Sequence, residues 1–325
     1  MRKHRKLLII GLALVIGAAV AYQQLARVPQ TILLLPDGDL LLYVNFKPLH
    51  LLNLSKSSVQ SDFEYKEFVR QTGIEWGSDL DNAAVSQRNP GSESESSAIF
   101  TGHFDSTRLK DYLQKLSSGT ERYADQTIYL IPHEGRTVRA CILKKNIIGI
   151  TNMGSAEPMR GIIDKSRDSS LMGRGPDLLE SHYRQAPLIS LAWAIYRVPS
   201  QPRAAQLPLG MSFDFLENTV TVASVRPEIL EFLFHRQGSL YFKARVLAEN
   251  DAAAQDLAER ASSFLALYRT VSKSVGAKGA DRDVKAIIDS IQIQQDGNSA
   301  VVTATIPEGF LKKATSENGA ISVGK

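Results

Sequence analysis

The sequence predicts an α+β fold: two related halves of antiparallel sheet with helices packed on one face, after an N-terminal transmembrane helix. Three observations lead to this prediction: an apolar stretch at the start of the chain, many short strand-like runs joined by turns, and a segment that occurs twice. The 325 residues are 43% hydrophobic and 22% charged, which is typical of globular proteins. After its apolar start, the chain is long enough for one large domain or two ordinary ones.

The first 26 residues indicate where the rest of the chain lies. Residues 1–6 form a basic tip, and residues 7–22 are an unbroken apolar run that a helix can extend to residue 26. About 20 helical residues cross a bilayer core, and a basic tip holds its own end in the cytoplasm. We therefore expect a single-pass signal anchor at residues 7–26 in a bacterial inner membrane, with the bulk of the chain periplasmic or extracellular.

The same stretch also fits a cleaved signal peptide. Ala19, Val20 and Ala21 match the small-x-small pattern that precedes a cleavage site. Both interpretations export residues 27–325, so the expected compartment does not depend on the choice.

The charge of the chain separates the tip from the body. The net charge is +4, and the tip alone contributes four positive side chains, those of Arg2, Lys3, Arg5 and Lys6. The body is therefore formally neutral, whereas a nucleic-acid-binding surface needs clustered surplus lysine and arginine. We expect no nucleic-acid partner. The expected partners are the membrane, through the N-terminal helix, and an envelope protein or lipid.

The single cysteine, Cys141, excludes an intramolecular disulfide and a zinc site built from paired thiolates. Its neighbours are apolar, so a buried small side chain in a strand is expected. A catalytic thiol is the alternative.

Strand-like runs follow one another along the chain. The Asp-Gly sequence at residues 296–297 readily adopts the positive φ angle that a tight hairpin needs. The pattern of residues 127–151 predicts a three-stranded meander. The predicted strands are residues 40–46, 127–132, 137–143, 146–151, 211–215, 219–225, 240–247, 290–294 and 300–306.

Three helices have recognisable ends. Residues 61–72 stop at Gly73, a typical C-terminal cap, and Asp105 or Ser106 caps a helix that runs to about residue 116. Residues 250–273 form the longest helix, with a core-facing stripe that a partner helix could alternatively cover. The stripe consists of Leu257, Ala261, Phe264, Tyr268 and Val271. Polar loops are expected at residues 87–96, 166–177 and 199–208, and the last is the preferred internal boundary.

A repeat suggests duplication. Residues 97–110 (SAIFTGHFDSTRLK) align without a gap with residues 299–312 (SAVVTATIPEGFLK), and each segment follows a strand, a helix and a second strand. We therefore expect two related α+β halves at residues 36–165 and 187–316, followed by a disordered tail at residues 317–325. Chance similarity over 14 residues is the alternative.

Candidate catalytic residues are few. His103 lies beside Asp105, and a histidine next to an aspartate can act as a base. The repeat favours a structural role instead, because their counterparts are Thr305 and Pro307. We therefore assign no catalytic residue. His103 and Asp105 are the candidates to be checked if the protein is an enzyme. The carboxylates of Asp37, Asp39, Asp79 and Asp81 could form acid/base pairs, but their Pro-Asp-Gly and Ser-Asp contexts favour turns and caps.

No metal or cofactor site is predicted. The histidines of the exported part lack metal-ligand spacing. Residues 319–325 match the Gly-x-x-x-x-Gly-Lys pattern of a phosphate loop, but no helix or hydroxyl follows Lys325 in this sequence, so we interpret the match as coincidence.

Five short motifs carry a resemblance. Pro36, Asp39 and Tyr43-Val44-Asn45 form a P-x-x-D-x-x-x-Y-V-N pattern near the apolar start. The others follow in order: Phe68-Val69, Thr72-Gly73-Ile74, Asp79-Leu80-Asp81 and Gly102-His103-Phe104-Asp105. Over about the first 110 residues the chain resembles a family of uncharacterised bacterial envelope proteins that are anchored at the N-terminus. The resemblance implies a membrane-anchored envelope protein and contributes no site residues.

These observations favour a non-catalytic, membrane-anchored extracytoplasmic binding or scaffold protein of unknown ligand. A periplasmic carrier or chaperone for lipids or lipoproteins is an alternative, which predicts an apolar pocket of several hundred Å³ beneath a curved sheet. A hydrolase that uses carboxylates or His103 is the third possibility, which predicts that His103, Asp105 and another acid converge in a cleft. The residues leave enzymatic activity open and favour a protein that is not an enzyme.

Overall fold

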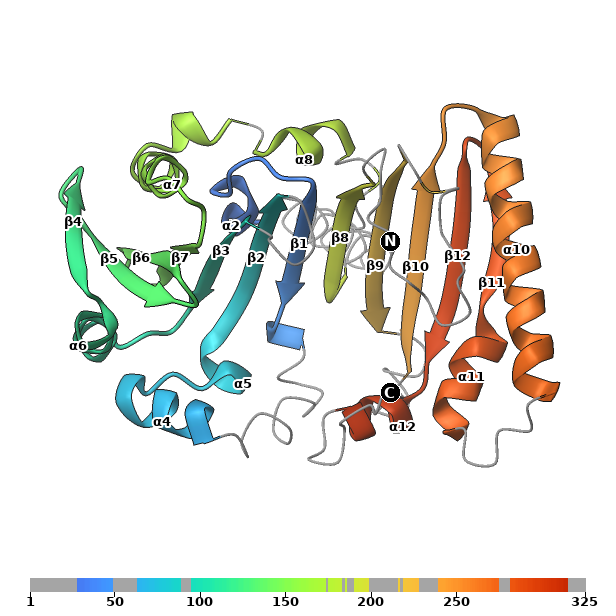
Figure 1. Ribbon diagram of the computed structural model, residues 1–325, viewed down its shortest axis with the longest axis horizontal. Coiled ribbons are helices and arrows are strands. Elements are labelled where there is room, and N and C mark those ends of the chain that lie inside the picture. Colours follow the sequence, from blue (N-terminus) through green and yellow to red (C-terminus); the bar gives the residue numbers. More distant parts are fainter. Residues whose placement is uncertain are drawn as a thin grey trace, which may run out of the picture.

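One antiparallel sheet dominates the fold. The computed structural model describes residues 28–48, 63–88, 95–173, 175–182, 185, 190–198, 216, 219–227, 239–274 and 281–314. Within them, twelve strands form a single sheet in the order β11-β12-β10-β9-β8-β1-β2-β3-β7-β6-β5-β4 (Figure 1). Every pair of neighbouring strands is antiparallel. The α+β class with an antiparallel sheet is therefore confirmed.

The strands alternate between two faces, as half-buried strands should. Their bounds are β1 Leu40–Asn45, β2 Leu80–Arg88, β3 Glu95–Gly102, β4 Gly119–Tyr123, β5 Gln126–His133, β6 Arg136–Lys144, β7 Ile147–Thr151, β8 Ala192–Arg197, β9 Val220–Pro227, β10 Leu240–Leu247, β11 Gln292–Asp296 and β12 Ser299–Ile306. The predicted meander is β5, β6 and β7, and the predicted Asp-Gly hairpin joins β11 and β12 with Gly297 at a φ of 57°. The predicted strand at residues 211–215 lies outside the described residues.

The helices lie between or beside these strands. Their bounds are α2 Gln30–Leu33, α4 Phe63–Thr72, α5 Trp76–Asp79, α6 Ser106–Leu116, α7 Glu157–Arg167, the 3₁₀ helix η1 Ser169–Met172, α8 Asp177–His182, α10 Asp251–Ser274, α11 Arg282–Ser290 and α12 Glu308–Ala314. The expected loop at residues 166–177 thus contains the end of α7 and all of η1. The preferred boundary at residues 199–208 and the centre of the loop at 87–96 lie outside the described ranges.

Two apolar cores lie on opposite faces of the β1–β7 part of the sheet. Ile147 belongs to the first core and Ile148 to the second, and successive residues of a strand point to opposite faces. We call the face of Ile147 the first face and that of Ile148 the second face. Helices α2, α7 and α8 contribute to the first core, and α4 and α6 contribute to the second. The expectation of helices on one face was therefore wrong for this part, because both faces of β5, β6 and β7 carry apolar residues that need cover.

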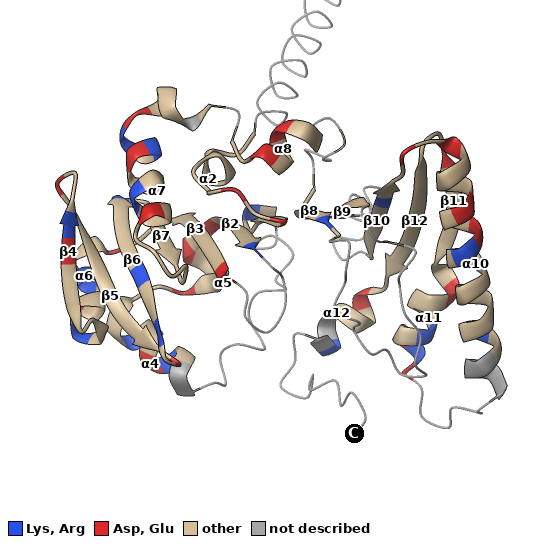
Figure 2. Ribbon diagram, turned by 45° about the horizontal axis from the view of Figure 1, so that its top comes forward, with Lys and Arg blue, Asp and Glu red and all other residues tan. Residues whose placement is uncertain are grey.

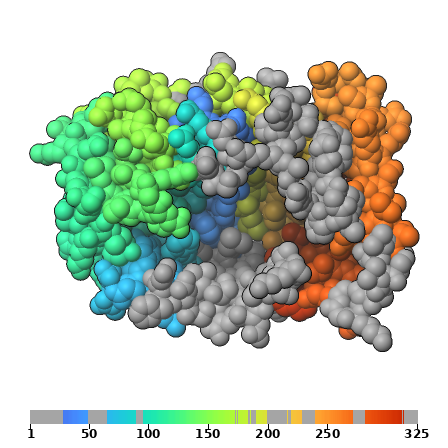
Figure 3. Space-filling view, viewed as in Figure 1, coloured from blue at the N-terminus to red at the C-terminus, as the bar shows by residue number. Residues whose placement is uncertain are grey.

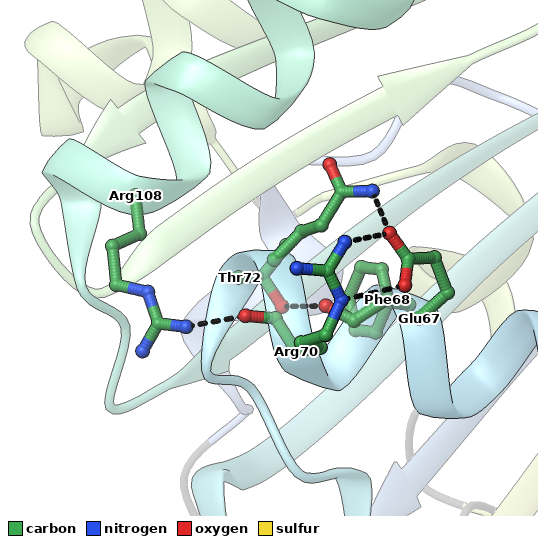
Figure 4. A network of polar contacts seen from close by, with 6 residues as sticks. Glu67, Phe68, Arg70, Thr72 and Arg108 are labelled. Atoms are coloured by element: carbon green, nitrogen blue, oxygen red, sulfur yellow. Dashed lines mark hydrogen bonds and ion pairs between the residues drawn. The ribbon is translucent and has the colours of Figure 1, made fainter.

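The second face is closed by the junction of α4 and α6 (Figure 4). Arg108 on α6 donates a 2.6 Å hydrogen bond from Nη2 to the carbonyl of Arg70 near the end of α4. Gly73 ends α4 at a φ of 72°, and a Cβ there would lie 2.5 Å from Arg108 Nη1. Hydrogen bonds from Arg70 and Gln71 lower the pKa of the Glu67 carboxyl to about 2. Gly73 is thus the predicted cap of α4, and its lack of a side chain leaves room for the Arg108 guanidinium to reach α4.

A third, smaller core lies under α10, which forms one margin of the molecule (Figure 3). Leu257 and Ala258 pack there with Val246 and Ala300. Further along the helix, Leu267 is 55% exposed and Tyr268 is 40% exposed. The predicted core-facing stripe of α10 is therefore confirmed at Leu257 and wrong at Tyr268, because the helix extends beyond its supporting strands; the side chain of Val271 lies outside the described part.

The two copies of the repeat are β3 followed by α6 and β12 followed by α12. Both halves run along the chain as strand, two helices, two strands and a helix. Their pairing differs, because β2 lies between β1 and β3, whereas β12 lies between β10 and β11. The sheet continues from one half to the other through β8 and β9. The strand order is thus not that of a simple duplication, and the relation between the halves stays a prediction.

The predicted basic tip, signal anchor and C-terminal tail lie outside the described residues. Among the residues that the structure does describe, no helix is long and apolar enough to cross a bilayer. Figure 2 shows basic and acidic segments scattered over both the helices and the strands.

Candidate functional site

The end of β3 places His103 at the surface. The amide of Gly102 donates to the carbonyl of Asn146 at 3.1 Å, and the amide of His103 donates to the carbonyl of Asp79 at 2.7 Å. A Cβ at Gly102 would lie 2.0 Å from that Asp79 oxygen, so only glycine fits. His103 is exposed, while Phe104 enters the second core with 8% exposure.

Asp105 has a local structural role. Its Oδ1 accepts the amide N–H groups of Thr107 at 3.0 Å and Arg108 at 3.2 Å, as an N-terminal cap of α6. The predicted strand end followed by a helix cap is therefore confirmed. Both of its described hydrogen bonds tie the carboxylate to its own helix, which offers no route for it to orient His103.

The predicted turn and cap roles are confirmed for Asp37 and Asp79, whereas Asp81 pairs with a lysine. Asp37 Oδ1 accepts the amide of Asp177 at 2.9 Å and so caps α8, and Asp79 Oδ2 accepts the amide of Glu75 at 2.8 Å. Asp81 forms a 3.4 Å ion pair with Lys47. Cys141 is fully buried, and burial raises the pKa of its thiol to about 12, as expected for a packed side chain.

Two surface hollows meet at Lys145, near the start of α6. One hollow has a volume of about 410 Å³ and is lined by Gly102, His103, Phe104, Lys145 and Asn146. The other, also of about 410 Å³, we call the lysine hollow. It is lined by Ser106, Lys110, Asp125, Gln126, Thr127, Tyr129, Ile142, Leu143, Lys144 and Lys145.

The lysine hollow has buried apolar residues at its base and three cations at its rim. Tyr129 is 6% exposed and Leu143 is 5% exposed, whereas Lys110, Lys144 and Lys145 are exposed. Burial raises the pKa of Tyr129, and Cys141 and Asp111 raise it further, so its hydroxyl stays a neutral donor. Figure 2 shows basic segments on β6 and α6 in this part of the sheet.

Asp125 is the acidic residue among those that line the lysine hollow, and part of its charge is shared with Arg167, whose Nη2 lies 4.0 Å from its Oδ2. Three lysines against one aspartate leave the lining formally positive. A partly enclosed positive surface attracts anions more strongly than isolated exposed lysines, because less water screens the charges.

Irregular backbone shapes this hollow. Ala124 and Asp125 form the two-residue turn between β4 and β5 with φ angles of 47° and 63°, although neither is glycine. The pairing of β6 with β7 shifts register between Ile142 and Lys144, which redirects the lysines that follow. Residues held at positive φ carry strain that the surrounding structure must offset, and such strain is frequent at functional positions.

Sequence reasoning missed the lysine hollow. In the sequence, Lys144 and Lys145 fall between two predicted strands and Lys110 falls within a predicted helix. These residues belong to elements that are far apart in the sequence, and the pairing of β5, β6 and β7 brings them to one end of the sheet.

Comparisons with known proteins identify no family. No family model and no curated protein sequence matches the chain. Among solved structures, crystal form III of TP0453 is similar with a TM-score of 0.45 and 11% identity, over 91% of this chain and all of that one. Crystal form IV of TP0453 gives a TM-score of 0.44 and 12% identity, over 91% of this chain and 98% of that one.

Proposed function

We propose that this protein is a non-catalytic binding module, anchored in the inner membrane by residues 7–26, with its body on the extracytoplasmic side. The lysine hollow is the proposed binding site, and its ligand or partner presents an anionic group there. The observation that carries this proposal is the placement of Lys110, Lys144 and Lys145 around one hollow with a buried apolar base. The neutral body makes this local positive lining distinctive.

The hollows described above fit a binding module better than the two alternatives. A lipid carrier needs a cavity lined mostly by apolar side chains, whereas polar and charged residues predominate around the lysine hollow. A hydrolase needs His103 oriented by an acid, and the carboxylate of Asp105 is occupied as a helix cap.

The topology can be tested in cells. Protease added to spheroplasts should digest the body, while intact cells should protect it and a cytoplasmic marker should stay protected in both. A body that survives in spheroplasts as the marker does would contradict the proposed export.

The anion site can be tested by a matched pair of variants of the full chain in detergent. The site variant replaces Lys110, Lys144 and Lys145 by glutamine, and the control replaces Lys66, Lys115 and Lys285, which are also exposed. Calorimetric titration with sodium phosphate, against sodium chloride at equal ionic strength, should show binding to the wild type and the control. The site variant should bind at least about tenfold more weakly, because charge attraction supplies most of the affinity.

Equal phosphate binding by the site variant and the control would reject the lysine hollow as the site. Absence of phosphate binding to the wild-type protein would reject the anionic ligand class.

A further inference from the structure

The chain enters the folded body directly after the predicted anchor. Arg27 is the residue between the proposed membrane helix and Val28, which already packs against the first core. Pro29 occupies the N-terminal cap position of α2, and Ile32 in that helix is fully buried. One extended residue spans about 3.5 Å, so this connection cannot hold the body far from the bilayer.

Helix α2 is tied to the helices beside it and cannot act as a loose tether. Lys165 on α7 donates a 2.8 Å hydrogen bond from Nζ to the carbonyl of Leu35. Asp37, just beyond, caps α8. Gly175 packs so closely on α2 that a Cβ there would lie 3.0 Å from Leu33 Cδ2, and its φ is 90°. The chain entry, α2, α7 and α8 therefore form one layer on the first face (Figure 1).

Among its described side chains, the same layer exposes one large apolar residue. Helix η1 connects α7 to α8 and carries Leu171, which is 55% exposed. In contrast, Leu178 and Leu179 on α8 are each 1% exposed. An exposed leucine in the layer through which the chain enters from a membrane is suited to the lipid headgroup region, where apolar side chains contact the acyl boundary.

We infer that the layer of α2, α7, η1 and α8 lies against the bilayer surface, with Leu171 at the headgroup boundary. This inference rests on the proposed anchoring. The occupant of this face is the lipid surface, because the length of chain between anchor and core leaves no room for a spacer. It follows that the body has a fixed orientation relative to the membrane.

The lining of the lysine hollow reaches both faces of the sheet. Tyr129 and Ile142 belong to the second core, on the face opposite α2, whereas Leu143 belongs to the first core. Helix α2 leads into the start of β1, which lies at the same end of the sheet as the start of β3, whereas Ser106 of the hollow follows the end of β3. The eight residues of β3 span about 26 Å at about 3.3 Å each. Measured along the sheet, the hollow therefore lies about one strand length from the end at which the chain enters β1.

The test uses the full chain in vesicles of phosphatidylethanolamine and phosphatidylglycerol that contain a doxyl-labelled lipid quencher. Leu171→Cys carries an environment-sensitive fluorophore in one sample, and Leu116→Cys, 44% exposed at the end of α6 on the second face, carries it in the control. The native Cys141 is fully buried and is not labelled. We expect at least about twofold stronger quenching at position 171 than at position 116.

A spacer variant checks the tether itself. Twenty glycine and serine residues inserted between Arg27 and Val28 should reduce the quenching at position 171 by at least half. Vesicle flotation separates the two proposals: a protein that does not float with vesicles overturns the anchoring and, with it, this inference. Floating protein with equal quenching at both positions overturns the inference alone. A fluorophore at position 171 that is shielded in detergent in a concentration-dependent manner would assign the face to a second copy instead and would also overturn it.

Discussion

Individual residues determine how tightly the end of β3 is held. Gly102 fits between β2 and the β6–β7 turn only because it has no side chain, and Asp105 then starts α6 with two hydrogen bonds. The Gly-His-Phe-Asp motif is therefore a structural corner that presents His103 beside a hollow. The sequence allowed the Asp105 cap to be predicted, because capping depends on neighbouring residues alone. It could not reveal the close approach to Asp79, which lies at the end of α5 and is distant in the sequence.

At this scale we predict opposite effects of two glycine-to-alanine substitutions. Gly102→Ala should reduce the free energy of unfolding by about 1–3 kcal/mol, because the new Cβ collides with backbone. Gly161→Ala should raise it by about 0.5–1 kcal/mol, since Gly161 lies inside α7 and a Cβ there meets nothing within 4 Å. Urea unfolding followed by circular dichroism measures both. Equal stability of Gly102→Ala and the wild type would contradict the close contact.

Among the elements, α10 shows that sequence periodicity can predict a helix without predicting which other elements the helix contacts. Its start is capped by Asn250, whose Oδ1 accepts the amide of Ala253 at 2.9 Å. Its far end is held by Arg269, whose Nη2 donates to the carbonyls of Ile288, Asp289 and Ile291 at 2.7, 3.1 and 2.9 Å. These carbonyls lie at the end of α11, so one arginine joins two helices. Periodicity does not reveal such a contact, because it depends on where α11 turns.

We predict that Arg269→Met reduces the free energy of unfolding by about 1.5–3 kcal/mol, because a charged donor to several carbonyls is lost. The matched control is Arg260→Met on the same helix, where an exposed pair with Asp256 at 2.8 Å contributes about 0.5 kcal/mol or less. Urea unfolding of both variants is the measurement. Equal losses would show that the helix-joining contact has no special energetic role.

Among the described residues, the apolar cores differ in size between the two ends of the sheet. The β1–β7 part has cores on both faces, whereas the β10–β12 part has a core of four buried residues under α10. The continuous sheet joins them through β8 and β9, and Val222 on β9 extends the first core across this junction. Stability should therefore decline from the first core toward the α10–α11 margin.

We predict that hydrogen exchange follows this gradient. Helix α7 buries Met159, Ile162, Ile163 and Ser166, while α11 buries none of its residues. Because local opening exposes little apolar surface at α11, its amides should exchange at least about tenfold faster than those of α7. Hydrogen–deuterium exchange with mass spectrometry provides the comparison. Equal protection of the two helices would contradict the gradient.

The sequence by itself determined the α+β class, the β5–β7 meander, the β11–β12 hairpin and the caps at Gly73 and Asp105. These features depend on side chains within a few residues of one another, so local patterns were sufficient. Only the tertiary structure decided that one sheet passes through both halves, that helices cover both faces of β1–β7, and that Lys110 joins Lys144 and Lys145 around one hollow. These features depend on which strands pair across long stretches of chain, and the strand orders around β2 and β12 differ despite their similar sequence surroundings.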